Sequence, residues 1–302
     1  MKITYIYHSG FLVESADAYY IFDYYRADFP VTDADKPVYV FVSHRHPDHY
    51  NPYVFEILRE KKVRRMTGII SYDIKPRNYT SHMEGVEIIA AEPDKEYTLD
   101  NGALVRTLRS TDKGVAYVVT FDDGGVPRSV YHAGDLNDWV WEGEDERVNK
   151  WMTGSYRRYL TAVEGMHFDA VMVPVDSRQG DDMFRGIEYL LEKVKADAVY
   201  PMHYWDKPEV IMQFAGKYPQ YADIIRYTED RMDRYSVIED KNPREIVLLR
   251  GSGCVYKKCT FCDYYSDSGK DEDVNYMINR AALSQVTGKY GNIEIINSGS
   301  VF

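Results

Sequence analysis

Four side chains of metal-ligating type stand within six residues of one another. Residues 41–49 read FVSHRHPDH, and the residues concerned are His44, His46, Asp48 and His49. The apolar run at residues 38–42 leads directly into them, so we expect the cluster on a loop at the end of a buried strand. Imidazole nitrogen and carboxylate oxygen are ligands that suit zinc and related metals. The spacing therefore predicts a site for one ion or for two adjacent ions.

The chain resembles the metallo-β-lactamase superfamily at this cluster and at two later segments. That family has a Gly-Asp pair after a later strand, and residues 129–135 (SVYHAGD) match it. It also has a last histidine after another strand, and residues 198–203 (AVYPMH) match that. The resemblance extends over roughly the first 235 residues. It implies an α/β fold, the αββα sandwich of the family, for residues 1–240.

The same resemblance implies a set of ligands for two metal positions. The first ion would be held by His44 and His46. The second would be held by three residues, which are Asp48, His49 and His203. Asp135 would bridge the two ions. Zinc is the expected metal, with iron or manganese as alternatives.

One departure from the family concerns the first metal position. The family supplies a third histidine there, whereas residues 110–114 of this chain read STDKG. Asp112 could take its place as an oxygen ligand, or His132 could turn in from the neighbouring strand. Otherwise the first position has only two histidines and the bridging carboxylate. We therefore expect metal to bind more tightly at the second position.

Other residues are expected beside the metal site. Related sequences place a histidine-bearing turn there, which matches His8, although a structural hydrogen bond would also explain it. Asp23 ends an apolar strand, where an aspartate often holds the free ring nitrogen of a ligand histidine, and the alternative is a simple turn residue. Asp176 follows another apolar run and could act near the metal or cap a helix. Trp139 and Trp141 could form a pocket wall or pack in the core.

All three cysteines of the chain lie close together near its end. They are Cys254, Cys259 and Cys262. Three thiolates on one loop can hold three irons of a 4Fe-4S cluster and leave the fourth iron open. An odd number argues against a disulfide framework, and a zinc site would need a fourth ligand, which Asp263 could supply.

This cysteine segment resembles the start of a radical S-adenosylmethionine domain. Its spacing is C-x4-C-x2-C, one residue longer than the commonest spacing in that family, and Phe261 supplies the aromatic residue before the last cysteine. The resemblance implies a 4Fe-4S cluster and S-adenosylmethionine as cofactors. A full barrel needs roughly 200 residues, whereas residues 244–302 offer about 60. We therefore expect a truncated, partial TIM barrel, which another chain could complete.

The elements that position these residues alternate between strands and helices. Opening antiparallel strands are expected at residues 3–7, 10–14 and 18–24, and later strands near 65–71, 86–90, 103–108, 115–122, 129–132, 168–175 and 198–202. Helices are expected at residues 51–62, 144–164, 183–195 and 208–217. The first would be capped by Asn51, with Pro52 at its first position. The charged, proline-containing segment 238–244 is expected to link the two domains.

Composition limits the function classes. The 302 residues are 44% hydrophobic, which suits a globular protein, and the net charge is -11 with a pI near 5.3. An acidic body disfavours binding to nucleic acid and to anionic membranes. The chain has no apolar stretch of about 18 residues and begins like an alternating strand rather than a signal peptide. We therefore expect a cytoplasmic protein that acts on a small molecule.

The metal cluster predicts a hydrolase that uses a metal-activated water on a small ester, lactone, thioester or phosphodiester. Asp48 or Asp135 could pass a proton to the leaving group. Two alternatives remain. One is a redox protein with a di-iron centre, and the other is a non-catalytic partner domain of a radical S-adenosylmethionine iron–sulfur enzyme.

Overall fold

The computed structural model describes residues 1–76, 81–205, 207–228, 234–253, 268–269 and 272–297. The chain divides into two compact units, Met1–Lys207 and Pro208–Phe302. The cysteines expected to hold an iron–sulfur cluster lie outside the described residues; these are Cys254, Cys259 and Cys262. Among the described helices, none is long and apolar enough to cross a membrane.

The first unit contains two six-stranded sheets. The first sheet has the spatial order β1 (Lys2–Tyr7), β2 (Gly10–Glu14), β3 (Tyr19–Phe22), β4 (Val38–Val42), β5 (Met66–Ser71) and β6 (Glu87–Ala91). Strands β1 to β3 pair antiparallel, and β3 to β6 pair parallel.

The second sheet has the order β14 (Val199–Met202), β12 (Ala170–Pro174), β10 (Pro127–His132), β9 (Val115–Asp122), β8 (Leu104–Arg109) and β7 (Glu96–Thr98). Its strands β10, β12 and β14 are parallel, while β7, β8, β9 and β10 pair antiparallel. A two-stranded sheet joins β11 (His167–Phe168) to β13 (Lys195–Ala196).

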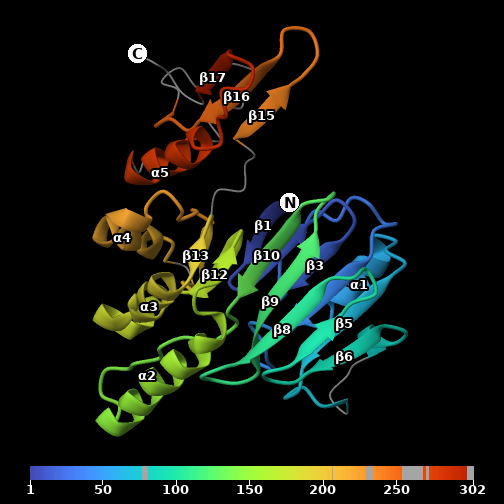
Figure 1. Ribbon diagram of the computed structural model, residues 1–302, viewed down its shortest axis with the longest axis vertical. Coiled ribbons are helices and arrows are strands. Elements are labelled where there is room, and N and C mark those ends of the chain that lie inside the picture. Colours follow the sequence, from blue (N-terminus) through green and yellow to red (C-terminus); the bar gives the residue numbers. More distant parts are fainter. Residues whose placement is uncertain (77–80, 206, 229–233, 254–267, 270–271, 298–302) are drawn as a thin grey trace. The chain divides into compact units, whose positions relative to one another are not determined.

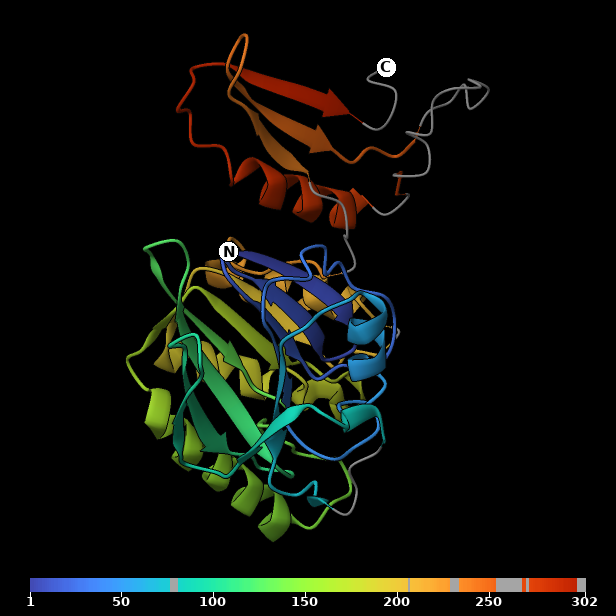
Figure 2. The ribbon, with the colours of Figure 1, turned by 90° about the vertical axis from the view of Figure 1, so that its right-hand side faces the viewer.

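Helices cover the outer faces of the two sheets (Figures 1 and 2). Helix α1 (Val54–Glu60) packs on the first sheet, while α2 (Glu146–Leu160) and α3 (Arg185–Lys193) lie on the side of the second. The layers are therefore helix, sheet, sheet, helix, as expected. Short 3-10 helices occupy Ser81–Met83, Thr161–Val163 and Ser177–Asp182.

The first helix begins later than the sequence predicted. Asn51 does not cap it, because its side-chain oxygen accepts a hydrogen bond of 3.1 Å from the Tyr53 backbone N–H, in a turn ahead of the helix. In α2, by contrast, Asp145 is the N-cap and accepts from the Arg147 backbone N–H at 2.8 Å.

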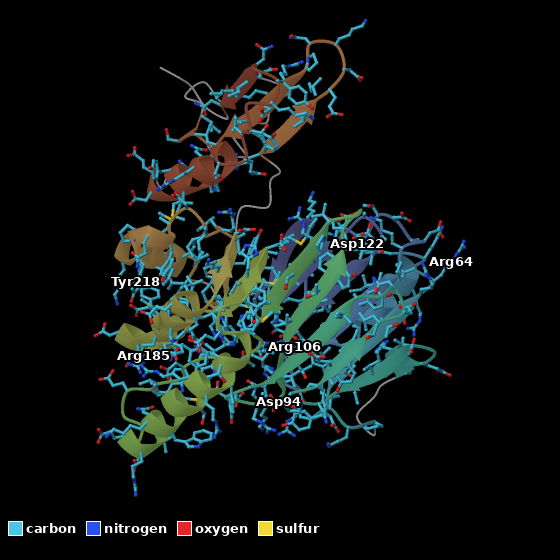
Figure 3. All side chains as sticks on the ribbon, in the orientation of Figure 1. Arg64, Asp94, Arg106, Asp122, Arg185 and Tyr218 are labelled. Atoms are coloured by element: carbon cyan, nitrogen blue, oxygen red, sulfur yellow. The ribbon has the colours of Figure 1, made fainter. Side chains whose placement is uncertain are left out.

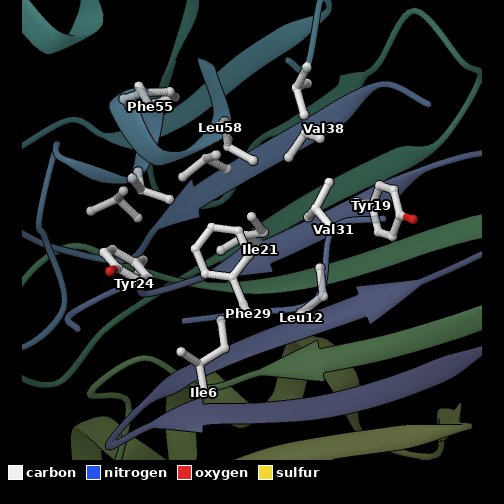
Figure 4. Close-up of a cluster of buried hydrophobic side chains, with 14 of the residues drawn as sticks. Ile6, Leu12, Tyr19, Ile21, Tyr24, Phe29, Val31, Val38, Phe55 and Leu58 are labelled. Atoms are coloured by element: carbon white, nitrogen blue, oxygen red, sulfur yellow. The ribbon is translucent and has the colours of Figure 1, made fainter. Parts of the chain in front are cut away.

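The alternation of side chains along the strands explains why two layers pack on the first sheet. Successive strand residues point to opposite faces. Tyr19 and Ile21 of β3 belong to the buried cluster under α1 (Figure 4). Tyr20 and Phe22 point the other way, and the Tyr20 ring stacks on Phe121 of β9 with 4.6 Å between centroids. Both faces of this strand are therefore apolar, and the sheet is buried between a helix and a second sheet.

The second unit holds α4 (Glu209–Lys217), a 3-10 helix at Pro219–Tyr221, and a three-stranded sheet ordered β15 (Tyr235–Ile238), β16 (Arg244–Leu249), β17 (Ile293–Asn297). Strands β16 and β17 are parallel, and α5 (Glu272–Leu283) lies between them in sequence. The expected linker at 238–244 is instead the turn of a β-hairpin, since β15 and β16 pair antiparallel. Asn242 adopts a left-handed conformation there, with φ 61°.

Candidate metal centre

Eight side chains of metal-ligating type gather in the first unit as two groups of four. The inner group is His8, Asp48, His49 and His203. The outer group is His44, His46, Asp112 and Asp135. Within each group, one ligand atom of every residue lies within 4.8 Å of the others. The residues lie on loops that follow β1, β4, β8, β10 and β14, so residues far apart in sequence meet at the ends of these strands.

The inner group is arranged around the carboxylate of Asp48. Its Oδ2 lies 3.2 Å from His8 Nε2, 3.8 Å from His49 Nε2 and 3.7 Å from His203 Nε2. The three imidazoles are almost completely buried, while the Asp48 side chain is 22% exposed. The sequence placed His8 beside the metal site, and the structure places it among the candidate ligands.

The outer group is more open. His44 Nε2 lies 3.4 Å from Asp135 Oδ2, and His46 Nδ1 lies 3.5 Å from Asp112 Oδ2. The His46 and Asp112 side chains are 38% and 37% exposed. Asp112 thus stands in the group that lacks the family's third histidine.

Asp135 lies between the two groups. Its Oδ1 is 3.2 Å from His49 Nε2 and 3.6 Å from His203 Nε2, while its Oδ2 faces His44 of the outer group. One carboxylate oxygen is therefore directed to each group, which is the geometry that a bridging ligand requires.

A buried carboxylate supports both groups from behind. Asp23 accepts a 2.7 Å hydrogen bond from His49 Nδ1–H and a 2.6 Å bond from the Ser43 hydroxyl. The Ser43 oxygen in turn lies 3.0 Å from His44 Nδ1 and can accept its proton. With Nδ1 protonated, the lone pair of each ring is on Nε2, which is the ligand atom. Burial acts to raise the pKa of Asp23, but the His49, His132 and His44 imidazoles hold it below its ordinary value.

Asp176 supports His203 in the same way. It is fully buried, and its Oδ2 lies 3.0 Å from His203 Nδ1. Arg178 also donates to it, from Nε at 2.9 Å and from Nη2 at 2.5 Å. Asp176 also caps a 3-10 helix, because it accepts from the Arg178 backbone N–H at the start of that helix. It therefore has both of the roles that the sequence left open, one beside the metal site and one as a helix cap.

His132 is turned away from both groups. Its Nε2 lies 2.9 Å from the Ser9 carbonyl oxygen, and its Nδ1 accepts from the Gly134 backbone N–H at 3.1 Å. Both ring nitrogens are thus used, and the side chain is held between the sheets by stacking on Phe22. The alternative in which His132 turns in to complete the first metal position does not agree with this arrangement.

Two glycines allow the ligand loops to approach each other. Gly114 and Gly134 have φ 70° and 51°. A Cβ on Gly114 would stand 1.8 Å from the Ser43 carbonyl oxygen, and one on Gly134 would stand 2.6 Å from the Ser43 Cβ. A side chain at position 114 would separate the loop that carries Asp112 from the end of β4. A side chain at position 134 would do the same to the loop that carries Asp135.

The loop after Asp135 is also held from the helical layer. Arg185 of α3, labelled in Figure 3, bonds Asp138 with 3.1 Å between Nη2 and Oδ2. The same Nη2 donates to Thr153 of α2 at 3.1 Å. The ligand loop is therefore tied to α2 and α3 three residues after Asp135.

Several ligand atoms are buried without a hydrogen-bond partner. They are both ring nitrogens of His8, Nε2 of His44, Nε2 of His49 and Oδ1 of Asp135. Unpaired buried polar atoms are costly, and such atoms in a native site point to an ion or ligand that is not among the protein atoms. Mixed imidazole and carboxylate donors suit a divalent transition metal. The residues present therefore fit one or two such ions.

The charges of the site are strongly coupled. Burial acts to raise the pKa of Asp135, but His49, His203 and His44 hold it well below its ordinary value. Burial acts to lower the pKa of His49, yet the Asp135 and Asp23 carboxylates raise it well above the usual range. Burial, followed by repulsion from His49, lowers the pKa of His44 to about 3. The site thus favours positive charge beside Asp135 and a free imidazole lone pair on His44.

Both groups open into one pocket of about 360 Å³. Its lining residues are His46, Asp48, Asp112, Asp135, Trp139, Trp141, Met152, Arg178, His203 and Trp205. Trp139 and Trp141 both take part in the wall, and their rings are parallel with 5.8 Å between centroids. The sequence reasoning missed Arg178 and Trp205. Arg178 follows Asp176 by two positions, and Trp205 follows His203 by two positions. This closeness in sequence was the only signal that could have predicted them.

Comparisons with known proteins agree with this geometry. Residues 2–149 match the family described as beta-lactamase superfamily domain. A comparison with curated proteins finds no match.

Three solved structures illustrate the likeness. Igni18, a metallo hydrolase from the archaeon Ignicoccus hospitalis, is 18% identical with a TM-score of 0.50, over 74% of this chain and 93% of that one. An isothiocyanate hydrolase from Delia radicum gut bacteria is 15% identical with a TM-score of 0.43, over 74% and 95%. Queuine lyase from Clostridium spiroforme, bound to SAM and queuine, is 51% identical with a TM-score of 0.23, over 24% of this chain and 31% of that one. Residues 2–149 are therefore similar to a beta-lactamase superfamily domain, and the first unit has the metallo-β-lactamase fold.

Proposed function

We propose that the first unit is a metal-dependent hydrolase of a small ester, lactone, thioester or phosphodiester, with zinc as the expected metal. The observation that carries the proposal is the cluster of ligand-type residues, several of whose ligand atoms are buried without a hydrogen-bond partner, beside a pocket that Asp48, Asp135 and His203 line. An ion held there would polarise a carbonyl or phosphoryl oxygen and lower the pKa of water to about 7.

The chain's own residues would orient the reaction and move its proton. Asp23 and Asp176 fix the ring orientation of His49 and His203, so that their Nε2 atoms face the Asp48 and Asp135 carboxylates. Asp48 lines the pocket and is the most exposed member of the inner group, so its carboxylate is our candidate for passing a proton to the leaving group. Asp135 is the alternative for that role.

The pocket favours a small substrate. A volume of about 360 Å³ is near the lower end of the range for ligand sites, roughly 300–1,000 Å³. A long polyanion would meet a chain of net charge -11. Arg178 is half exposed over the rings of Trp141 and Trp205, at 5.9 and 5.1 Å, where its guanidinium can donate to one substrate oxygen.

Turnover of simple probes tests the proposal. Metal-loaded protein is incubated with bis(4-nitrophenyl) phosphate, 4-nitrophenyl acetate, γ-butyrolactone and acetyl-coenzyme A. We expect hydrolysis of at least one probe, and its loss in EDTA and in Asp135→Asn. Arg178→Gln should raise KM roughly tenfold while kcat changes less, because it removes a contact made equally in the ground and transition states. Rates no higher than those of the free metal ion would count against a hydrolase.

A redox centre is the second candidate for the same residues. Imidazole and carboxylate ligands with a carboxylate between the two positions also suit a pair of iron ions. Element analysis of protein purified without oxygen separates the two readings. Two irons per chain, with a visible spectrum that changes on reduction, would favour the redox reading over the hydrolase.

For residues 244–302 we propose a segment related to the beginning of a radical S-adenosylmethionine domain. The support is the C-x4-C-x2-C spacing and its position in sequence between β16 and α5, within a strand–helix–strand unit whose two strands are parallel. Anaerobic reconstitution with iron and sulfide should give the absorption and electron paramagnetic resonance of a 4Fe-4S cluster. A bound zinc ion and no cluster would favour the alternative with Asp263.

A further inference from the structure

We infer that His8 is itself a ligand of the inner metal position, so that this position has three imidazoles and two carboxylates available. This inference rests on the proposed metal site. It assigns to the turn between β1 and β2 a role in binding a divalent transition metal, in addition to the loops that follow β4, β10 and β14.

The first argument is the environment of the His8 ring. The residue is 1% exposed, and neither Nδ1 nor Nε2 has a hydrogen-bond partner. Its Nε2 lies at ion-pair distance, 3.2 Å, from Asp48 Oδ2, without the alignment of a regular hydrogen bond. His49 Nε2 and Asp135 Oδ1 show the same pattern, since they are also at ion-pair distance, 3.2 Å, without the alignment of a regular hydrogen bond. His8 therefore has the geometry of the expected ligands, and a buried histidine kept only for structure would use its nitrogens.

The second argument is the backbone at His8. Its φ is 58°, in the left-handed region that a residue with a side chain rarely occupies. His203 is also left-handed, with φ 65°, and its N–H donates to the His8 carbonyl oxygen at 3.3 Å. Strained backbone of this kind clusters at functional sites, where the surrounding structure holds it in place. Here the strain brings the two rings together, with 4.3 Å between their centroids.

The Tyr5 hydroxyl completes the support, because it accepts the His8 backbone N–H at 2.7 Å. The backbone of this turn is thus bonded on both sides, to β1 and to the loop after β14, while the ring faces the Asp48 carboxylate. A turn that is fixed by its backbone and directs a buried imidazole at the Asp48 carboxylate is suited to supply a metal ligand.

The test compares wild type with His8→Gly, and with His167→Ala as the control. Glycine tolerates a φ of 58°, so this substitution removes the imidazole and relieves the backbone strain. His167 is an exposed histidine that bonds Asp197 at 2.8 Å, outside the site. Apo proteins are titrated with cobalt(II), which reports affinity by chelator competition and coordination number by the intensity of its visible absorption.

We expect His8→Gly to raise the cobalt dissociation constant of the tight event at least tenfold and to change the visible spectrum, and His167→Ala to do neither. The thermal unfolding midpoint of the apo protein should be unchanged or higher in His8→Gly. His8→Asn, which also tolerates the left-handed region, should give an intermediate affinity.

Three results would overturn the inference. One is wild-type affinity and spectrum in His8→Gly. Another is weaker binding with an unchanged spectrum, which would assign His8 to positioning Asp48. The third is a lower apo unfolding midpoint with intact metal binding, which would make the residue structural. Absence of tight cobalt binding by the wild type would instead refute the proposed metal site itself.

Discussion

The inner and outer ligand groups contain the same kinds of side chain and differ in how these are supported. Every imidazole of the inner group is buried, and two of the three are held at Nδ1 by the buried carboxylates of Asp23 and Asp176. In the outer group only His44 is held in this way, through Ser43, while His46 and Asp112 are more than a third exposed. Affinity for a metal depends on pre-oriented ligands as well as on their number. The inner position should therefore bind first and more tightly.

The largest effect is expected where the two groups meet. Asp135→Asn keeps the size of the side chain and the backbone carbonyl that accepts from Trp139, but it removes the charge that faces both groups. Metal content by mass spectrometry should fall close to zero at both positions. The metal-dependent gain in unfolding free energy, about 2.7 kcal/mol at a metal concentration of 100 times Kd, should disappear. Retention of one tight ion would show that the two positions do not share Asp135.

A slightly smaller effect that is common to both groups is expected from Asp23→Asn. The amide N–H would replace either Oδ2, which accepts from His49 Nδ1–H and the Ser43 hydroxyl, or Oδ1, which accepts from the Ser43 backbone N–H, so at least one of these hydrogen bonds would be lost. Loss of such a partner typically weakens metal binding 10- to 100-fold. The dissociation constants of both steps of a zinc titration should rise. Urea unfolding of the apo protein should show that the free energy of unfolding falls by about 1–3 kcal/mol. Asp197→Asn, at an exposed Asp–His pair, is the matched control.

Asp176→Asn should weaken metal binding at the inner group and leave the outer group unchanged. Asp176 contacts His203 of the inner group and Arg178, and no described contact joins it to the outer group. The tight step of the zinc titration should weaken about tenfold, at the lower end of the range for such partners, and the loose step should stay unchanged. Equal weakening of both steps would contradict the assignment of the tight step to the inner group.

Particular residues show what sequence could predict. The HRHPDH run, the Gly-Asp pair and the last histidine could be read because each follows an apolar strand, and strand ends in a layered α/β fold meet at one edge. The orientation of His132 could not be read. It depends on a carbonyl oxygen of Ser9, which is 123 residues away. The placement of His8 among the ligands was hidden for the same reason, since a left-handed turn brings it to His203. Contacts that depend on backbone direction at a turn leave little trace in residue spacing.

Substitutions of Asp112 should have the smallest effect on metal binding. They also give the sharpest test of the difference between the inner and outer groups. The Asp112 oxygen stands 3.5 Å from His46 Nδ1, and its segment is the one in which the resemblance implies a histidine. Its side chain is 37% exposed, so its contribution competes with water. Asp112→Ala should therefore remove only the loose step of a zinc titration, and Asp112→His should tighten that step, since it adds an imidazole on the same loop. The tight step should be the same in both variants and in wild type. If Asp112→Ala changed the tight step instead, the order of the two positions would be reversed. If Asp112→His failed to tighten the loose step while Asp112→Ala removed it, the carboxylate itself would be the ligand that the outer group requires.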